Sequence, residues 1–352
     1  MQYLNNLFQT SPRVAGWIAF AGSERAGRIA DDGVVGSNNA AWQAGARPDY
    51  YIEAQRIGYQ VVLGGLAGGD LALVDRGLRA IEWGYRPDVM GPAFDWSFNR
   101  DFGSILAHAA HPRTMFGAAS VETVLAIVGD PSTWFGPNAA IYDRAYALRS
   151  AIEQSATAYI ASGDAVVFRA GCANSSQLVF QATWMQGTYV LTGDATFRVE
   201  AKETIRAMMA LQRPDGAFGE KLQADGQRGF DTSYCVQTLR ELVAYEEMLP
   251  GSGEGSWRTQ VRDYITKGAN WLLGRIRPDG SIDTTGNSRT AADGAPQEGS
   301  FAKGWEIDQT AITLAQYAVA FGRWEELAPV ITAVQYRGQE YDHIGDIASP
   351  TV

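Results

Sequence analysis

Four side chains with proton-transfer or carboxylate-binding chemistry stand close to the starts of apolar helical patterns. His111 and Arg113 lie ahead of one pattern, while Asn174 and Tyr234 begin two others. His and Tyr can transfer protons when their surroundings shift the pKa, and Asn and Arg can hold a carboxylate. The spacing therefore allows an acid–base site that binds an acidic ligand.

Structural roles are equally open for the same residues. Asn174 and Asp231 each precede a helical pattern and could be N-caps, and Tyr234 could simply pack in the first turn. His108 and His111 could share a helix face, but no third ligand with recognisable spacing accompanies them, so we predict no metal site.

Aromatic and charged side chains are dense in the segments between helical patterns, where flat rings could stack on sugars. Carboxyl groups in these segments could instead serve as the acid and base of a glycoside hydrolase. These carboxyl residues are Asp95, Asp101, Glu220, Asp231, Glu298, Glu306 and Asp308.

The elements that position these residues are read from helical periodicity, which gives pairs of segments. The predicted pairs are 51–66 with 71–85, 116–128 with 141–161, 175–191 with 195–211, 232–249 with 257–276, and 307–321 with 324–334. Arg-Pro-Asp-Gly follows two of the second members, at 213–216 and 277–280, and Arg86-Pro87-Asp88 resembles it. Proline and Asp-Gly end a helix and favour a tight turn. The chain is therefore predicted to be an array of helical hairpins.

First members of the pairs carry few charges, whereas second members are amphipathic. An inner ring of buried helices inside an outer solvated ring explains this difference. We predict an all-α fold, an α/α toroid of about five to seven hairpins, forming one domain over 1–352. The long connections precede the inner helices, whose N-termini suit an anionic ligand.

Composition narrows the function further. The net charge of −10 argues against nucleic acid or an anionic membrane as a partner, and the two cysteines, Cys172 and Cys235, form no disulfide framework. The sequence carries no phosphate-binding or dinucleotide motif, so we predict no cofactor. Residues 14–21 faintly resemble a signal peptide but are better read as a first helix.

The hairpin array, the His111-Pro112-Arg113 segment, Asn174 and Tyr234 together resemble the α/α-toroid polysaccharide lyases that include alginate and glucuronan lyases. The resemblance implies β-elimination on a uronic-acid-containing glycan. Asn174, His111 and Arg113 would neutralise the uronate carboxylate, and Tyr234 would act as base or acid. The Asn-Asn-His run of one alginate-lyase group is absent, because Ala40 follows Asn38-Asn39.

The resemblance also implies an acidic polysaccharide or oligosaccharide partner and a secreted or periplasmic location. The predicted substrate-binding residues are His108, Trp96, Arg228, Trp184, Trp305 and Arg289. Two alternatives stay open, a glycoside hydrolase on the same toroid and a non-catalytic glycan-binding protein. The oligomeric state is left open.

Overall fold

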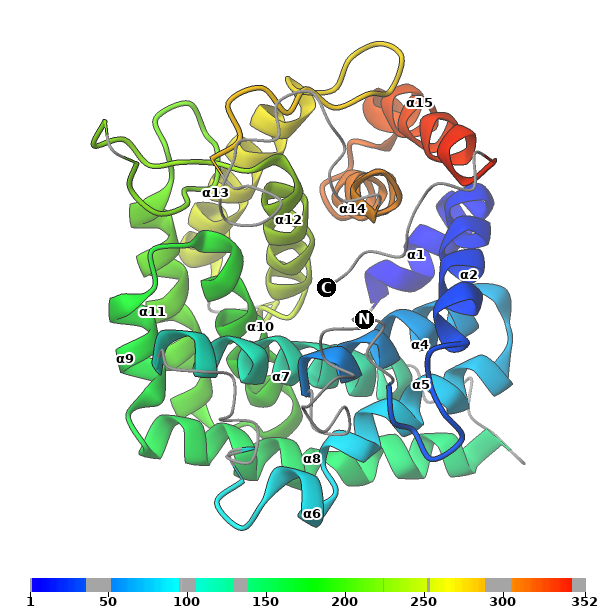
Figure 1. Ribbon diagram of the computed structural model, residues 1–352, viewed down its shortest axis with the longest axis vertical. Coiled ribbons are helices and arrows are strands. Elements are labelled where there is room, and N and C mark those ends of the chain that lie inside the picture. Colours follow the sequence, from blue (N-terminus) through cyan, green and yellow to red (C-terminus); the bar gives the residue numbers. More distant parts are fainter. Residues whose placement is uncertain are drawn as a thin grey trace, which may run out of the picture. The chain divides into compact units, whose positions relative to one another are not determined.

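A computed structural model of the chain describes residues 2–35, 52–94, 96, 106–129, 138–223, 225–251, 254–288 and 305–343. Within these ranges every regular element longer than an isolated bridge is a helix (Figure 1). The all-α prediction is confirmed. No helix of the described ranges is long and apolar enough to cross a membrane.

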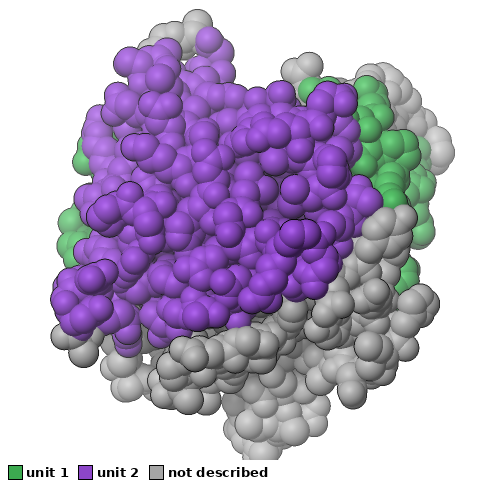
Figure 2. Space-filling view, turned by 90° about the horizontal axis from the view of Figure 1, so that it is seen from above, with its two compact units in different colours: residues 1–172, 180–203 green, residues 173–179, 204–352 purple. Residues whose placement is uncertain are grey.

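The described residues form two compact units, coloured separately in Figure 2. Unit 1 comprises residues 1–172 and 180–203, and unit 2 comprises residues 173–179 and 204–352. The prediction of one domain over 1–352 stays a prediction.

Unit 1 begins with α1 (Gln2–Thr10) and α2 (Pro12–Ala26). The second of these confirms a helix over 14–21. A 3-10 turn (η2, Ile52–Arg56) leads into α4 (Ile57–Gly68), which pairs with α5 (Leu71–Gly84). Next come α6 (Pro87–Met90), α7 (Leu106–Val128), α8 (Ala139–Ala161) and α9 (Asp164–Gly171).

Two helices pass from one unit's residues to the other's, namely α10 (Ser175–Thr192) and α11 (Ala195–Leu211). Unit 2 then contains α12 (Thr232–Glu247), α13 (Gly255–Leu273), α14 (Trp305–Ala320) and α15 (Trp324–His343). Within this unit α12 packs on α13 and α14, and α14 packs on α15, as the yellow-green to red ribbons of Figure 1 show. The five predicted pairs are therefore confirmed as helices. Most ends differ by a few residues, but α7 begins at Leu106, well before 116, and α15 ends at His343, well after 334.

The burial pattern separates the two members of each pair. Between 114 and 125 every side chain of α7 is buried, whereas α8 alternates buried and exposed positions. The same contrast distinguishes α12 from α13. First members are thus covered on all sides and second members keep a solvated face, as the charge pattern predicted.

One turn recurs four times in the residues that the structure describes, each time around an Asp-Gly pair. These pairs are Asp32-Gly33, Asp215-Gly216, Asp225-Gly226 and Asp279-Gly280. In each turn the Asp carboxylate accepts a hydrogen bond from the main-chain N–H two residues later, at 2.9–3.2 Å, and the glycine has a φ between 78° and 98°. This positive φ explains the requirement for glycine.

Arg86-Pro87-Asp88 is not a copy of this turn, which corrects the sequence interpretation. Arg86 precedes α6, and its guanidinium binds the Asp88 carboxylate at 2.7 Å. Proline is well suited to the first position of a helix, so here it begins a helix rather than following one. The missed copies are Asp32-Gly33 and Asp225-Gly226, where no Arg-Pro signals the turn.

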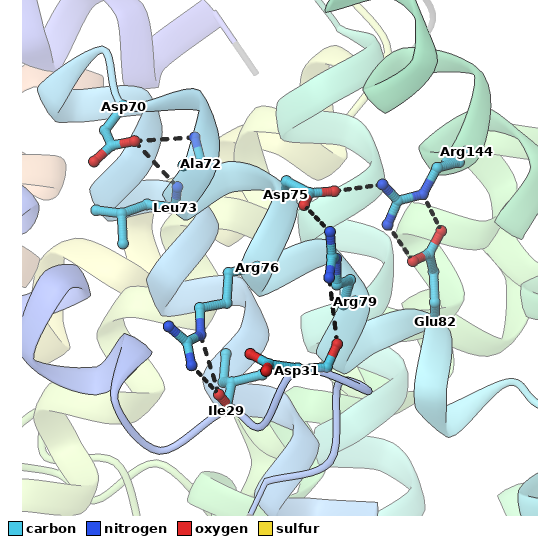
Figure 3. A network of polar contacts seen from close by, with 10 residues as sticks. All are labelled: Ile29, Asp31, Asp70, Ala72, Leu73, Asp75, Arg76, Arg79, Glu82 and Arg144. Atoms are coloured by element: carbon cyan, nitrogen blue, oxygen red, sulfur yellow. Dashed lines mark hydrogen bonds and ion pairs between the residues drawn. The ribbon is translucent and has the colours of Figure 1, made fainter.

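Helix α5 holds the Asp32-Gly33 turn by binding main-chain carbonyls of the turn segment. Arg76 of α5 donates to the carbonyl of Ile29 at 2.6 Å, and Arg79 donates to the carbonyl of Asp31 at 3.3 Å (Figure 3). Asp75 of the same helix, with Glu82, binds Arg144 of α8, so α5 is also tied to the next second-member helix.

Candidate functional site

The start of α12 carries a buried carboxylate. Asp231 is 4% exposed, and its Oδ1 accepts hydrogen bonds from the N–H groups of Ser233 (3.1 Å) and Tyr234 (3.2 Å) and from the Ser233 hydroxyl (2.6 Å). Asp231 is therefore the N-cap of α12, as its position predicted. Tyr234 lies half-buried in the first turn of the helix.

A second buried carboxyl group lies on the connection that precedes α12. Glu220 is 2% exposed and begins a short hairpin, in which its N–H donates to the carbonyl of Gly229 at 2.9 Å. Leu222 and Arg228 form the bridge of this hairpin, and Asp225-Gly226 forms its turn. The hairpin places Glu220 at its base.

The hairpin base is attached to the start of α10. The N–H of Ser175 donates to the carbonyl of Gly219 at 3.0 Å, and the N–H of Lys221 donates to Oδ1 of Asn174 at 2.9 Å. Arg228 donates at 3.5 Å to the carbonyls of both Ala173 and Glu220. The main chain on both sides of Glu220 is thus bound to residues 173–175.

The starts of α10 and α12 are themselves linked, because the side-chain amide of Gln237 donates to the carbonyl of Ser176 at 3.3 Å. Both carboxyl groups also affect the thiol of Cys235. Burial raises the pKa of Cys235, and the carboxyl groups of Glu220 and Asp231 raise it further. Both carboxyl groups therefore lie near the buried thiol of Cys235 in unit 2.

Three of the predicted site residues lie in unit 2. Asn174 and Arg228 contact the main chain around Glu220, and the N–H of Tyr234 donates to Asp231. The amide oxygen of Asn174 binds the main chain rather than facing a ligand. The sequence interpretation missed the hairpin that carries Glu220. The signal that could have found it is the Asp225-Gly226 pair, which favours a tight hairpin turn.

The histidine segment belongs to unit 1, and its backbone corrects the sequence interpretation. We expected His108 and His111 in a long loop, but α7 begins at Leu106 and includes Pro112 in its second turn. The imidazole groups of His108 and His111 lie outside the described side chains.

The guanidinium of Arg113 contacts side chains of two neighbouring helices, α8 and α9. Its guanidinium binds the Asp164 carboxylate at 2.7 Å and lies 5.1 Å from the ring centre of Tyr159. The Tyr159 hydroxyl donates at 2.9 Å to Gln181, which in turn donates to Glu200 at 2.8 Å. Within unit 1, Arg113 therefore joins a polar network that crosses several helices.

The remaining predicted binding residues divide into two groups. Trp96 is 2% exposed and donates to the carbonyl of Gly84 at 2.7 Å, and Trp184 is 0% exposed. Both indoles are core side chains with no ring face open to a sugar. The side chain of Trp305 and the whole of Arg289 lie outside the part of the chain that the structure describes. No group of three His, Cys, Asp or Glu side chains in the described ranges is arranged for a metal ion.

No family model matches the sequence, and no curated protein matches it. The structure resembles a glycosyl hydrolase of family 88 from Bacteroides vulgatus, with a TM-score of 0.52 and 10% identity over 90% of this chain and 84% of that one. It also resembles the unsaturated glucuronyl hydrolase of Bacillus sp. GL1, with a TM-score of 0.54 and 13% identity over 91% of this chain and 82% of that one. A polysaccharide lyase gives a TM-score of 0.49 at 12% identity, which is too low to support an inference.

The similarity to the two hydrolases covers most of this chain and most of theirs. Both have paired helices arranged as an α/α toroid. The chain therefore has the α/α-toroid fold that its hairpin pattern predicts.

Proposed function

We propose that this chain is a glycoside hydrolase acting on a uronic-acid-containing oligosaccharide, with Glu220 and Asp231 as its carboxyl pair. The observation that carries the proposal is the burial of both groups beside the linked starts of α10 and α12. Glycosidases use two carboxyl groups, one as a proton donor and one as a base or nucleophile.

The two groups have environments suited to different roles. The main chain on both sides of Glu220 is fixed by hydrogen bonds, which supports this residue as the positioned donor to the leaving oxygen. Asp231 accepts two helix N–H groups, an arrangement suited to negative charge, which supports it as the carboxylate. Proton donation by Glu220 and attack by water then cleave the glycosidic C–O bond.

The acidic character of the substrate rests on two supports. One structural relative is described as an unsaturated glucuronyl hydrolase that degrades glycosaminoglycan. The guanidinium of Arg228 also lies beside the Glu220 main chain, where a sugar carboxylate could find a cation.

The second candidate is the polysaccharide lyase implied by the sequence resemblance. The observation that favours it is Tyr234, half-buried in the first turn of α12 and close to the Asp231 cap. A lyase would use Tyr234 for proton transfer and would not need a buried acid at 220.

The experiment compares Glu220→Gln, Asp231→Asn and Tyr234→Phe on a panel of uronate oligosaccharides, with release of reducing ends and formation of unsaturated uronate measured separately. Hydrolysis predicts a loss of about 100-fold or more in kcat for Glu220→Gln and Asp231→Asn, with Tyr234→Phe tolerated. Asparagine is also a good N-cap, so Asp231→Asn removes the charge without removing the cap.

Asp70→Asn is the matched control, because Asp70 caps α5 by the same two N–H contacts. New unsaturated product, together with an inactive Tyr234→Phe variant, would instead establish the lyase. Release of neither product from any member of the panel would refute both.

A further inference from the structure

We propose that Asn174 is a positioning residue for Glu220, holding its carboxyl group in place through the Lys221 N–H. This assignment rests on the proposed hydrolase function and differs from the carboxylate-binding role that the sequence resemblance implies for Asn174. It follows from the contact of the Asn174 amide oxygen, which accepts a hydrogen bond from the Lys221 N–H within unit 2.

The contacts around Glu220 form a cradle made of consecutive residues. Residue 219 accepts from Ser175, and residue 221 donates to Asn174, so the residues on each side of Glu220 are bound to adjacent positions at the start of α10. Arg228 joins the carbonyl of Glu220 to the carbonyl of Ala173.

The end of α11 packs against residue 219 of the cradle. A Cβ atom at Gly219 would lie 2.0 Å from the carbonyl oxygen of Leu211, so the chain passes there with no spare room. Residue 219 is therefore packed closely against Leu211, and hydrogen bonds join residues 219 and 221 to residues 174 and 175. Two of these contacts use a side chain, those of Asn174 and Arg228. Substitution of Asn174 removes a hydrogen-bond acceptor without removing a charge.

Side-chain position matters because a proton donor must lie within hydrogen-bond reach of the leaving oxygen. A displacement of about 1 Å in a catalytic group can lower the rate by about 100-fold. Loss of the Asn174 acceptor should accordingly lower kcat while leaving the affinity for the substrate nearly unchanged.

The test compares Asn174→Leu, which removes the acceptor, with Asn174→Asp, which keeps an oxygen at the same reach. We expect Asn174→Leu to lower kcat by about 10- to 100-fold with KM changed less than about threefold, and Asn174→Asp to recover most of kcat. Asn270→Leu is the control, because Asn270 of α13 accepts a hydrogen bond from Arg323 on an exposed face.

A direct substrate ligand would behave in the opposite way. Asn174→Asp would then be the worse variant, with a strongly raised KM, because its charge would repel a sugar carboxylate. That result, or an Asn174→Leu variant with the kcat of the Asn270→Leu control, would overturn the proposal.

Hydrogen exchange at the Lys221 amide separates this inference from the function on which it rests. If the native protein hydrolyses none of the oligosaccharides, the hydrolase proposal fails regardless of Asn174. Faster exchange of the Lys221 amide in Asn174→Leu than in Asn270→Leu would then still support the positioning contact. Equal exchange rates would refute it.

Discussion

Replacing the turn glycines by alanine should give a graded loss of stability that is set by the space at each turn. Gly226, Gly216 and Gly280 have φ values of 78°, 98° and 81° in turns with the same hydrogen bonds, so the backbone cost of adding a Cβ is similar. That cost is about 1–2 kcal/mol, partly offset by about 0.4–1 kcal/mol from a more restricted unfolded chain. Gly226→Ala should therefore lower the free energy of unfolding by about 1 kcal/mol.

The surroundings of the three glycines then separate them. A Cβ at Gly226 meets nothing within 4 Å, whereas at Gly216 it would lie 2.8 Å from the Lys267 carbonyl oxygen, and at Gly280 2.2 Å from that of Ala333. Because these are main-chain atoms of α13 and α15, they cannot rotate away. Overpacking of this kind costs about 1–3 kcal/mol, so Gly280→Ala should lose about 2–4 kcal/mol in total.

Urea unfolding measures the series, with the midpoint and the slope compared between variants. The expected order of destabilisation is Gly280→Ala, then Gly216→Ala, then Gly226→Ala. If Gly280→Ala lies within about 0.5 kcal/mol of Gly226→Ala, the turn does not press on α15 and the reasoning fails.

Two further predictions concern the charges and thiols. Burial raises the pKa of Asp75, but Arg144 and Arg79 lower it by more, so the pKa in the folded protein is below its ordinary value. The ionised Asp75 therefore stabilises the folded state above the ordinary carboxyl pKa of about 4, and this stabilisation is lost as the pH falls. Arg144→Met should thus lower the free energy of unfolding by about 1 kcal/mol at pH 7. Urea unfolding at pH 3 should show a smaller difference between the variant and the native protein. An equal difference at both pH values would contradict the contribution of this ion pair. Cys235 is buried, and burial raises the pKa of its thiol. A thiol reagent at pH 8 should therefore modify one cysteine per native chain, Cys172, and two cysteines after unfolding. Rapid reaction of both cysteines in the native protein would refute the burial of Cys235.

Helices were predictable where polar caps and amphipathic periodicity agree. The range 195–211 was predicted at the residues where α11 begins and ends, because Asp194 caps its start and its charged face is regular. The early start of α7 was not predictable, because Pro112 normally marks a helix boundary. Here the helix continues through it, with Arg113 in the next position bound to the first residue of α9.

The candidate site was predictable only in its local parts. Asp231 as a helix cap follows from the residues around it, since capping needs only a short stretch of sequence. The contact of Asn174 with the Lys221 N–H depends on the path of a hairpin and a distant helix start, which no local pattern specifies. Trp96 and Trp184 were assigned to sugar binding because periodicity does not distinguish a ring in the core from one at its edge.

The tight fit of the Asp-Gly turns against second-member helices has a consequence for how this architecture tolerates change. At Gly33, Gly216 and Gly280 the closest partner is a carbonyl oxygen, of Arg79, Lys267 and Ala333 respectively. Every amino acid carries that oxygen, so this one contact between turn and helix does not depend on which side chain occupies the helix position. Substitution of the partner residue therefore leaves the contact in place, provided that the turn keeps its glycine.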